Sequence, residues 1–505
     1  MLYKVRSLGL QGISGYEVTA ECDLASGLPN FDIVGLPDTA VKEARERVRS
    51  AIYPFPVGRI TVNLAPANLR KSGTIYDLPI CVGILAASGQ LTWSDPHCAF
   101  VGELSLSGTL RPVVGMLPMA LAARDAGIQR LFVPADSAPE ATLAEGLTVY
   151  PVETVEQLAA HLTGQSPITP APPWSGAPDA LPLPDFAEVR GQEPVKRALE
   201  IAAAGGHNLL MVGPPGSGKS MLARRFPSIL PPLSQREALE ATQIHSVMGL
   251  TTKEHPLLTQ RPFRAPHHTI SAGGMAGGGN PYPRPGEISL AHHGVLFLDE
   301  LPEFHKDVIE VLRQPMEEGV ISVVRSAASE TYPCDFTLLC AMNPCKCGYF
   351  GHPTRPCTCS PSAVRQYRSR VSGPLLDRID LCVEMDPVAF DQLHSAAPAE
   401  NSAALRQQVQ TAREIQAKRY AAPGFENIHC NAQLTAGQVR RVCRMTPAAE
   451  ALLRSSYDAL GLSARAHDRL LRVARTIADL AGRSLLDEEA LLEALQYRAQ
   501  EKVEI

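Results

Sequence analysis

The sequence predicts an α/β protein of three parts: a mixed α+β N-terminal domain, a central parallel sheet and a helical C-terminal domain. Three observations lead to this prediction. A glycine-rich loop of the phosphate-binding type follows a short apolar run near the middle of the 505-residue chain. Seven prolines crowd between residues 163 and 185. Beyond about residue 390, apolar residues recur at helical spacing.

The proline-rich stretch marks the clearest domain boundary. Its prolines are too dense for a helix or a central strand, so residues 163–185 should form a stiff, extended linker. We therefore expect an N-terminal domain over residues 1–162, a central domain over residues 186–390 and a helical domain over residues 391–505.

The composition is that of a globular protein, with 45% apolar and 20% charged residues. An aromatic content of 5% and a net charge of −5 argue against a protein that stacks many bases or coats DNA, but not against a local basic channel. The sequence lacks an apolar run of about 18 residues and a signal peptide, so we expect no membrane association. Twelve cysteines without regular disulfide spacing are typical of the reducing cytoplasm, where we expect the protein.

Apolar patterning predicts the elements of the first two parts. In the N-terminal part it predicts strands over Arg59–Leu64 and Arg130–Val133 and a helix over Met116–Ala126. In the central part, continuously apolar runs predict buried parallel strands. These runs cover Asn208–Val212, Val295–Leu298 and Phe336–Cys340.

The C-terminal part should consist of helices. Helical spacing covers Ser402–Tyr420, Pro447–Leu460, Ala464–Leu480 and Glu488–Gln496. The last three helices begin behind Thr446, Ser463 and Asp487, residue types that cap helix N-termini.

The loop after Asn208–Val212 matches G-x-x-x-x-G-K-[ST]. Its glycines let backbone N–H groups converge on phosphate oxygens, and the following helix offers its positive end to the same anion. Lys219 would reach the β- and γ-phosphates of ATP, and Ser220 would ligate Mg²⁺. The alternative is a glycine-rich turn with a chance lysine. The residues expected to bind ATP here are Gly213, Pro214, Pro215, Gly216, Ser217, Gly218, Lys219 and Ser220.

Asp299 and Glu300 follow the apolar run Val295–Leu298. A buried parallel strand that ends in a carboxylate delivers it beside the phosphates, at the carboxyl edge of the sheet. Asp299 would hold Mg²⁺, and Glu300 would orient and polarise the attacking water. A strand followed by an ordinary solvated acidic loop is the alternative.

Four cysteines crowd between residues 345 and 359 as two C-x-C pairs, Cys345 with Cys347 and Cys357 with Cys359. Four thiolates on a short hairpin could close a tetrahedral Zn²⁺ site, with His352 as a substitute ligand. The alternative is four reduced cysteines in a loop.

From about residue 187 to 500 the sequence resembles the magnesium-chelatase-like AAA+ proteins. The strings that carry the resemblance are Val189–Gln192, Arg261–His268 and Gly373–Asp380. The resemblance implies a sensor 1 role for Asn343, which would read the γ-phosphate. It also implies an arginine finger at Arg378, which would reach a neighbouring subunit's nucleotide, and a sensor 2 arginine at Arg465.

The N-terminal part resembles the proteolytic domain of Lon proteases, with an S5-like fold. The carrying strings are Phe100–Gly115, Ala122–Ile128 and Phe132–Pro134. Such a protease needs a serine nucleophile and a lysine base. The serine would fall at Ile75, near Ser72. The lysine would fall shortly after Gly115, but the sequence holds no lysine between Lys71 and Lys196. We therefore expect an inactive Lon-protease-like domain that serves as a scaffold or in assembly.

This order of domains resembles the ComM (YifB-like) family. The resemblance implies a homohexameric AAA+ ATPase and helicase that drives branch migration during natural transformation. Its partners would be single-stranded or branched DNA and recombination proteins. The alternatives are a chelatase-type motor that remodels a partner protein, an ATP-dependent Lon-like protease and a non-catalytic assembly platform. The magnesium chelatase motor subunit lacks such an N-terminal domain, which argues against the first.

The residues that would contact DNA stay open. The glycine-rich segment Gly273–Gly279 could be a mobile loop that lines a pore, or an ordinary flexible loop. Two groups of arginines could bind phosphates in a channel or form salt bridges. They are Arg365, Arg368 and Arg370, and Arg469, Arg472 and Arg475.

Overall fold

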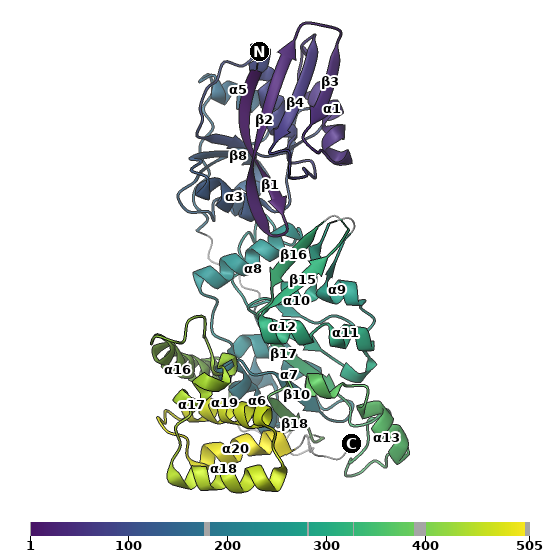
Figure 1. The fold of residues 1–505 in the computed structure, drawn as a ribbon, viewed down its shortest axis with the longest axis vertical. Helices are drawn as coiled ribbons and strands as arrows, with labels where there is room; N and C mark the ends of the chain where they lie inside the picture. The colour runs from purple at the N-terminus through teal and green to yellow at the C-terminus, as the bar shows by residue number, and fades with distance from the viewer. Residues whose placement is uncertain (1, 176–181, 280–281, 327, 388–399, 500–505) are drawn as a thin grey trace. The chain divides into compact units, whose positions relative to one another are not determined.

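The computed structural model describes residues 2–175, 182–279, 282–326, 328–387 and 400–499 (Figure 1). The chain divides into two compact units. Unit 1 comprises Met1–Asp179 and Gln235–Leu258, and unit 2 comprises Ala180–Ser234 and Thr259–Ile505. The segment Gln235–Leu258, which we expected within the central domain, therefore folds with the N-terminal part.

A seven-stranded sheet forms the centre of unit 1, in the order β3-β4-β2-β1-β5-β8-β9. β1, β2 and β4 pair antiparallel, whereas β5, β8 and β9 run parallel to one another. The strands predicted over Arg59–Leu64 and Arg130–Val133 are confirmed as β4 and β8. The bounds are β1 (Leu2–Gln11), β2 (Ser14–Ala25), β3 (Asn30–Val34), β4 (Arg59–Ala65), β5 (Cys98–Phe100), β8 (Arg130–Pro134) and β9 (Thr148–Val152).

Helices and a small hairpin complete the N-terminal part of unit 1. The helices are α1 (Thr39–Ala51), α2 (Asp77–Ala87), α3 (Met116–Asp125), α4 (Ala138–Ala141) and α5 (Val155–Leu162), with the 3-10 turn η1 (Ala135–Ser137). The hairpin joins β6 (Glu103–Leu104) to β7 (Leu110–Arg111). α2 is buried along nearly its whole length because it packs on β1 and β2. α3 confirms the helix predicted over Met116–Ala126.

Helix α8 (Gln235–Val247) packs on α3 within unit 1. The buried carboxylate of Glu140 joins them, because its Oε1 accepts hydrogen bonds from the backbone N–H of Leu117, at 2.7 Å, and from the hydroxyl of Ser246. Thr251 donates to Oε2 of the same carboxylate at 2.9 Å. A buried carboxylate is costly without such donors, so Glu140 explains why this excursion of the chain folds onto unit 1.

The proline-rich stretch lies without helix or strand from residue 165 to 175. This part follows the surface of unit 1, where Ile168 is buried and the N–H of Ala171 donates to Val149 O at 2.8 Å. Trp174 N–H donates to Thr142 Oγ1 at 3.2 Å. Residues 176–181 lie outside the described residues, and the linker stays a prediction.

Unit 2 contains a five-stranded sheet in the order β11-β14-β17-β10-β18, and every pairing in it is parallel. β10, β14 and β17 confirm the three predicted strands, and their side chains are almost all buried, as continuously apolar runs require. The bounds are β10 (Leu209–Val212), β11 (Phe263–Arg264), β14 (Val295–Leu298), β17 (Thr337–Met342) and β18 (Leu381–Glu384).

Short helices and two hairpins connect these strands. The helices are α6 (Glu193–Gly205), α7 (Lys219–Arg225), α9 (Ala272–Ala276), α10 (Glu287–Leu290), α11 (Lys306–Glu310), α12 (Arg313–Glu318), α13 (Pro361–Arg368) and α14 (Gly373–Leu376), with the 3-10 turns η2 (Phe186–Glu188), η3 (Phe226–Ile229) and η4 (Leu301–Glu303). The hairpins pair β12 (Gly277–Gly278) with β13 (Arg284–Pro285) and β15 (Val320–Val324) with β16 (Ser329–Pro333).

The glycine-rich segment differs from the loop that we expected. It forms α9 and then β12, with Met275 fully buried. Gly277 has a φ of +127°, and a Cβ there would lie 2.7 Å from the carbonyl oxygen of Arg284. Its glycines therefore allow close approach of two backbones rather than a mobile loop.

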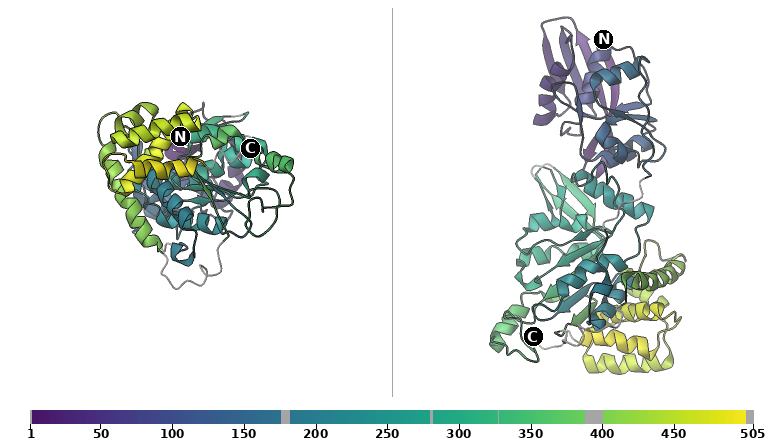
Figure 2. Two further views of the ribbon diagram at one scale, coloured as in Figure 1. Left: turned by 90° about the horizontal axis from the view of Figure 1, so that it is seen from below. Right: turned by 180° about the vertical axis from the view of Figure 1, so that it is seen from behind.

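Helices fill the described C-terminal part of unit 2, where they lie side by side in both sets of views (Figures 1 and 2). The predicted caps are confirmed, because Thr446, Ser463 and Asp487 each accept a hydrogen bond from the N–H of the residue three positions on. None of the helices within the described ranges is both long and apolar enough to cross a membrane. The bounds are α16 (Ser402–Tyr420), η5 (Asn431–Gln433), α17 (Ala436–Val442), α18 (Pro447–Leu460), α19 (Ala464–Leu480) and α20 (Glu488–Ala499).

Candidate active site

The predicted phosphate-binding loop runs from the end of β10 to the start of α7. Gly216 and Gly218 have φ angles of +79° and +94°, a left-handed conformation that glycine adopts without strain. Gly213 has no room for a side chain, since a Cβ there would lie 2.7 Å from Cβ of Met385. The path of the backbone itself therefore requires the glycines of the motif.

Lys219 is buried at the first position of α7, and its ammonium group lies inside the loop. Nζ donates hydrogen bonds to the carbonyls of Gly213, at 2.7 Å, and Pro214, at 2.9 Å. It also lies 3.2 Å from Oδ1 of Asn343, which follows β17. The fold thus brings together the lysine and the polar residue that we expected to contact the terminal phosphate.

Asp299 and Glu300 directly follow β14. Oδ2 of Asp299 accepts a hydrogen bond from the hydroxyl of Ser220 at 2.5 Å. A hydroxyl and a carboxylate are oxygen ligands of the kind Mg²⁺ takes, so the two side chains fit the predicted metal role. Burial lowers the pKa of Lys219, and the charges of Asp299 and Glu300 act against that shift.

β10, β14 and β17 are neighbouring parallel strands, so their carboxyl ends share one edge of the sheet. The phosphate loop, the two carboxylates and Asn343 leave from these three ends. Ligands of open parallel sheets bind at such an edge. The arrangement can hold a polyphosphate with a divalent cation and keep a carboxylate beside it.

Glu300 has a strained backbone and an unexpected neighbour. Its φ of +53° is uncommon for a residue with a side chain, and the carboxylate is 57% exposed. Nδ1 of His268 lies 3.4 Å from Oε2 of Glu300, and the His268 ring lies against His267 with centroids 4.1 Å apart. The sequence showed these histidines only as part of a family string. The histidines follow β11, the edge strand beside β14, so their position in the sequence was the one sign that they could lie near Glu300.

Arg378, the predicted arginine finger, pairs within its own chain. Its guanidinium donates to the carboxylate of Glu317 on α12 and to the carbonyl of Pro374, the latter at 2.5 Å. Arg465, the predicted sensor 2 residue, is exposed in the first turn of α19. The contacts found among the described residues do not join either arginine to the phosphate loop, so their roles stay predictions.

Arg469 and Arg475 of α19 are buried, which contradicts the idea that they line a channel. Arg469 donates to the backbone carbonyls of Asp377 and Ile379, on either side of Arg378. Arg475 pairs with Asp479 one helical turn on, at 3.0 Å. We call the C-terminal helices α16 to α20 the lid. Arg469 joins the lid to the segment that carries the predicted finger, and Arg475 joins α19 to the chain that follows it, because it also donates to Ser484 O at 2.9 Å. This internal role was not visible in the sequence.

Two of the arginines near the cysteines are also engaged in the fold. Nε of Arg368 donates to Pro344 O at 3.0 Å, and Arg370 pairs with Glu303 at 3.1 Å. Arg365 is exposed on α13 and stays a candidate for contact with a phosphate backbone.

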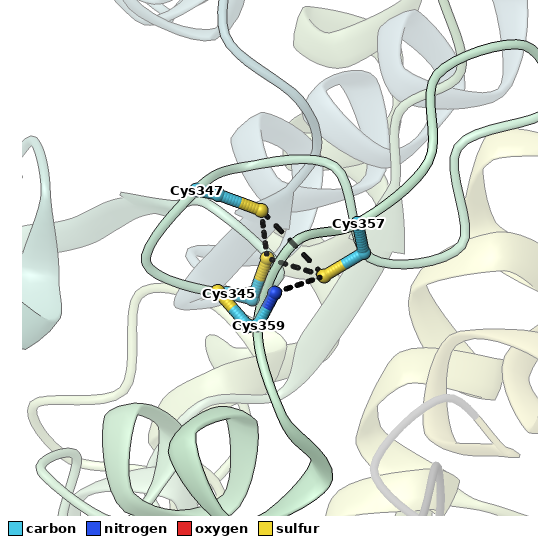
Figure 3. Close-up of side chains that lie close together, drawn as sticks. All are labelled: Cys345, Cys347, Cys357 and Cys359. Carbon is cyan, nitrogen blue, oxygen red and sulfur yellow. Dashed lines mark hydrogen bonds between the residues drawn. The ribbon is translucent and has the colours of Figure 1, made fainter.

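The four clustered cysteines approach one another as predicted (Figure 3). Their sulfur atoms all lie within 4.8 Å of one another. Backbone hydrogen bonds at Tyr349 and Thr358 lower the pKa of the Cys347 thiol to about 5. His352, the substitute ligand that we considered, instead accepts backbone hydrogen bonds from Thr354, at 3.1 Å, and Arg355, at 3.0 Å.

Two residues of unit 1 bear on the expected loss of protease activity. Ile75, where a Lon-type serine would fall, is buried. Lys71, the neighbour of Ser72, is fully buried and donates to the backbone carbonyls of Pro66 and Leu69, the latter at 2.7 Å. Its ammonium group is thus engaged with the backbone.

Three family models match the chain. A model described as "Magnesium chelatase, subunit ChlI" covers residues 185–393, and "Magnesium chelatase, subunit ChlI C-terminal" covers residues 399–498. A model described as "Subunit ChlI of Mg-chelatase" covers residues 20–137. That third match lies in unit 1. A magnesium-chelatase 67 kDa subunit of Chlorobaculum parvum, in comparison, is 28% identical over 207 residues, which are 40% of this chain and 27% of that protein.

The fold and the site define a magnesium-chelatase-like protein of the AAA+ class. The chain is 44% identical to YifB of Escherichia coli, over 97% of this chain and 95% of that protein. It is 43% identical to an uncharacterised protein of Mycobacterium tuberculosis, over 97% of each chain, and 42% identical to "Competence protein ComM" of Haemophilus influenzae, over 98% of this chain and 97% of that protein. The chain belongs to the magnesium-chelatase-like family of YifB and ComM.

Proposed function

We propose that this chain is an ATP-hydrolysing motor that works as a homohexamer on DNA. The observation that carries the ATPase part is the convergence of Lys219, Asn343, Ser220 and the two carboxylates after β14 at one edge of the sheet. The DNA part is supported by the similarity to a protein named for competence. On this basis we propose branch migration of DNA during natural transformation, with recombination proteins as partners.

Each side chain has a defined task in this proposal. Lys219 binds the β- and γ-phosphates, and Ser220 and Asp299 hold Mg²⁺, which supplies charge neutralisation for phosphoryl transfer. Glu300 orients and polarises a water molecule for in-line attack on the γ-phosphate. Asn343 contacts that phosphate and so distinguishes ATP from the product.

Two further residues would complete the site from a neighbouring subunit and from the lid. Arg378 would leave Glu317 and stabilise transition-state charge at the adjacent subunit's nucleotide. Arg465 would respond to the nucleotide from the first turn of α19. Because each site then needs two subunits, hydrolysis would depend on assembly of the ring.

The proposed cofactors are Mg²⁺ with the ATP substrate and Zn²⁺ at the four cysteines. The cysteines of the described segments are free thiols. Thiolate ligands and ATP both suit the reducing cytoplasm, where we propose that the motor acts.

The test of the proposed function is the rate of ATP hydrolysis with and without a four-way DNA junction, for the wild type and for Glu300→Gln. We expect the junction to stimulate the wild type, and Glu300→Gln to bind ATP but turn it over at least about 100-fold more slowly. A turnover that the junction leaves unchanged would count against action on branched DNA.

A chelatase-type motor that remodels a partner protein is the second candidate, because the family models carry that description. It predicts turnover stimulated by a protein partner and indifferent to DNA. We propose that unit 1 is proteolytically inactive, since Ile75 lies where the serine would fall and no lysine follows Gly115 where the base would fall. Degradation of casein that Ser72→Ala abolishes would contradict this last point.

A further inference from the structure

The four cysteines lie at the spacing of a single tetrahedral ion (Figure 3). The sulfur of Cys345 lies 3.3 Å from that of Cys347 and 3.6 Å from that of Cys357, and the last two are 3.5 Å apart. Zinc–sulfur bonds of about 2.3 Å in a tetrahedron would place sulfurs about 3.8 Å apart. These separations are far longer than a disulfide bond of about 2.05 Å.

The donor set selects the kind of ion. Four thiolates in tetrahedral geometry favour Zn²⁺, or iron as a single ion, over Mg²⁺ or Ca²⁺, which prefer oxygen. An iron–sulfur cluster places its own iron and sulfide atoms between the thiolates and needs them farther apart. Cys345 is fully buried, so the ion would lie partly inside the protein.

The turn that carries the first two cysteines touches the phosphate-binding loop. Gly348 has a φ of +84°, and its N–H donates to Cys345 O at 2.9 Å, which closes the turn. A Cβ on Gly348 would lie 2.5 Å from Cδ and 2.7 Å from Cγ of Pro215. The backbone of the turn therefore lies directly against a proline in the middle of the loop.

The same cysteine segment is joined to the site at a second point. Cys345 follows Asn343 by two residues, and Oδ1 of Asn343 lies 3.2 Å from Nζ of Lys219. At the other end of the segment, Cys359 directly precedes Ser360, the N-cap of α13. α13 returns to the start of the segment through Arg368, which donates to Pro344 O at 3.0 Å.

We propose that Cys345, Cys347, Cys357 and Cys359 bind one Zn²⁺, and that this ion positions the phosphate loop for nucleotide by holding Gly348 against Pro215. The bracing role rests on the proposed binding of ATP by this loop, but not on any action on DNA. The zinc is a structural ion here, and the residues that act through it are positioning residues.

The first experiment counts metal in the full-length protein. Purified wild type should contain about one zinc per chain, because four thiolates complete one tetrahedral site. Cys357→Ser should lose the metal, whereas Cys98→Ser, at a buried cysteine of unit 1, should retain it. A wild type without zinc, or one that carries iron instead, would overturn the choice of ion.

The second experiment compares two glycines of the same segment. Gly348 and Gly351 both have positive φ, at +84° and +77°, so alanine strains the backbone similarly at either position. Only at Gly348 would the new Cβ collide with Pro215, because a Cβ on Gly351 meets open space. Gly348→Ala should bind a fluorescent ATP analogue with Mg²⁺ about tenfold more weakly, and Gly351→Ala within about twofold of the wild type.

A third variant tests the contact itself. Pro215→Ala removes the ring that the new Cβ would strike. The double variant Pro215→Ala/Gly348→Ala should therefore bind the ATP analogue less than about twofold more weakly than Pro215→Ala alone. The bracing role would be overturned if Gly348→Ala and Gly351→Ala bound the analogue equally well. It would also be overturned if Gly348→Ala weakened binding about tenfold even in the Pro215→Ala background. Both readouts are made without DNA. Failure of the junction to stimulate turnover would therefore leave this inference standing, whereas a wild type that binds no ATP would overturn the bracing together with the proposed function.

Discussion

The two units each bury a lysine beside a proline-containing loop, and the two lysines have different surroundings. In unit 2, Nζ of Lys219 bonds to two loop carbonyls and also meets Asn343, with Asp299 and Glu300 close enough to act on its pKa. In unit 1, Nζ of Lys71 bonds to the carbonyls of Pro66 and Leu69, and burial alone is the cause of its lowered pKa.

The difference shows what distinguishes a site from a buried cation. Both ammonium groups are buried and donate hydrogen bonds to backbone carbonyls, and both lysines have a lowered pKa. Burial and a shifted pKa therefore do not by themselves identify a catalytic residue. Only Lys219 lies where the ends of several strands bring polar side chains from distant parts of the sequence together. This difference supports the proposed role of Lys219 in ATP binding, whereas Lys71 contacts backbone carbonyls.

The largest expected effect comes from the same substitution at the two lysines. Lys219→Met should lower ATP turnover by at least about 100-fold, since it removes the cation that we propose binds the transferring phosphoryl group. Lys71→Met should leave turnover within about twofold. Steady-state hydrolysis of both variants is the measurement, with thermal unfolding as the check that each is folded. Loss of turnover in Lys71→Met would break the comparison.

The next effect tests whether the predicted finger acts beyond its own chain. Arg378→Ala should lower turnover by about 10³-fold or more and leave ATP binding intact, because an arginine finger acts on the transition state. Glu317→Ala removes the salt-bridge partner of Arg378, leaves its hydrogen bond to the Pro374 carbonyl, and should retain turnover within about threefold. Equal losses in the two variants would mean that the salt bridge, rather than a neighbouring site, is what matters.

A smaller effect is expected at the histidine beside Glu300. His268→Ala should lower kcat by about tenfold with little change in KM, because it frees the carboxylate that it contacts at 3.4 Å. His267→Ala is the matched control, since His267 is exposed and bonds to Thr269 at 2.9 Å. It should stay within about twofold. Identical kinetics for the two variants would remove His268 from the site.

The sequence was sufficient for the parts of the fold and site that local patterns encode. Apolar runs predicted the strands β10, β14 and β17, and glycine positions predicted the phosphate loop. Residue type alone predicted the N-caps of α18, α19 and α20. The excursion Gln235–Leu258 was not predicted, because it is fixed by the long-range bonds of Glu140. The contacts of His268 and Arg469 could not be predicted for the same reason, because their partners Glu300 and Asp377 are distant in sequence.

The smallest expected effect concerns the pH dependence of unit 1. Burial lowers the pKa of Lys71 below its ordinary value of 10.5, so above the native pKa the unfolded chain binds more protons than the native state. The free energy of unfolding should therefore rise with pH from the native pKa up to about 10.5, and fall again as the pH is lowered through that window. Lys71→Met lacks the titrating group and should lack this component.

The measurement can be confined to unit 1, because both tryptophans of the chain, Trp93 and Trp174, belong to it. The measurement is denaturant unfolding followed by tryptophan fluorescence. The free energy of unfolding of the wild type should increase relative to that of Lys71→Met as the pH rises toward 10.5. At neutral pH the variant should be about 1–3 kcal/mol less stable, since two buried carbonyls lose their donor. A difference that stays constant with pH would mean that Lys71 titrates as an ordinary lysine. The contrast between the two buried cations would then rest on Asn343 and the carboxylates alone.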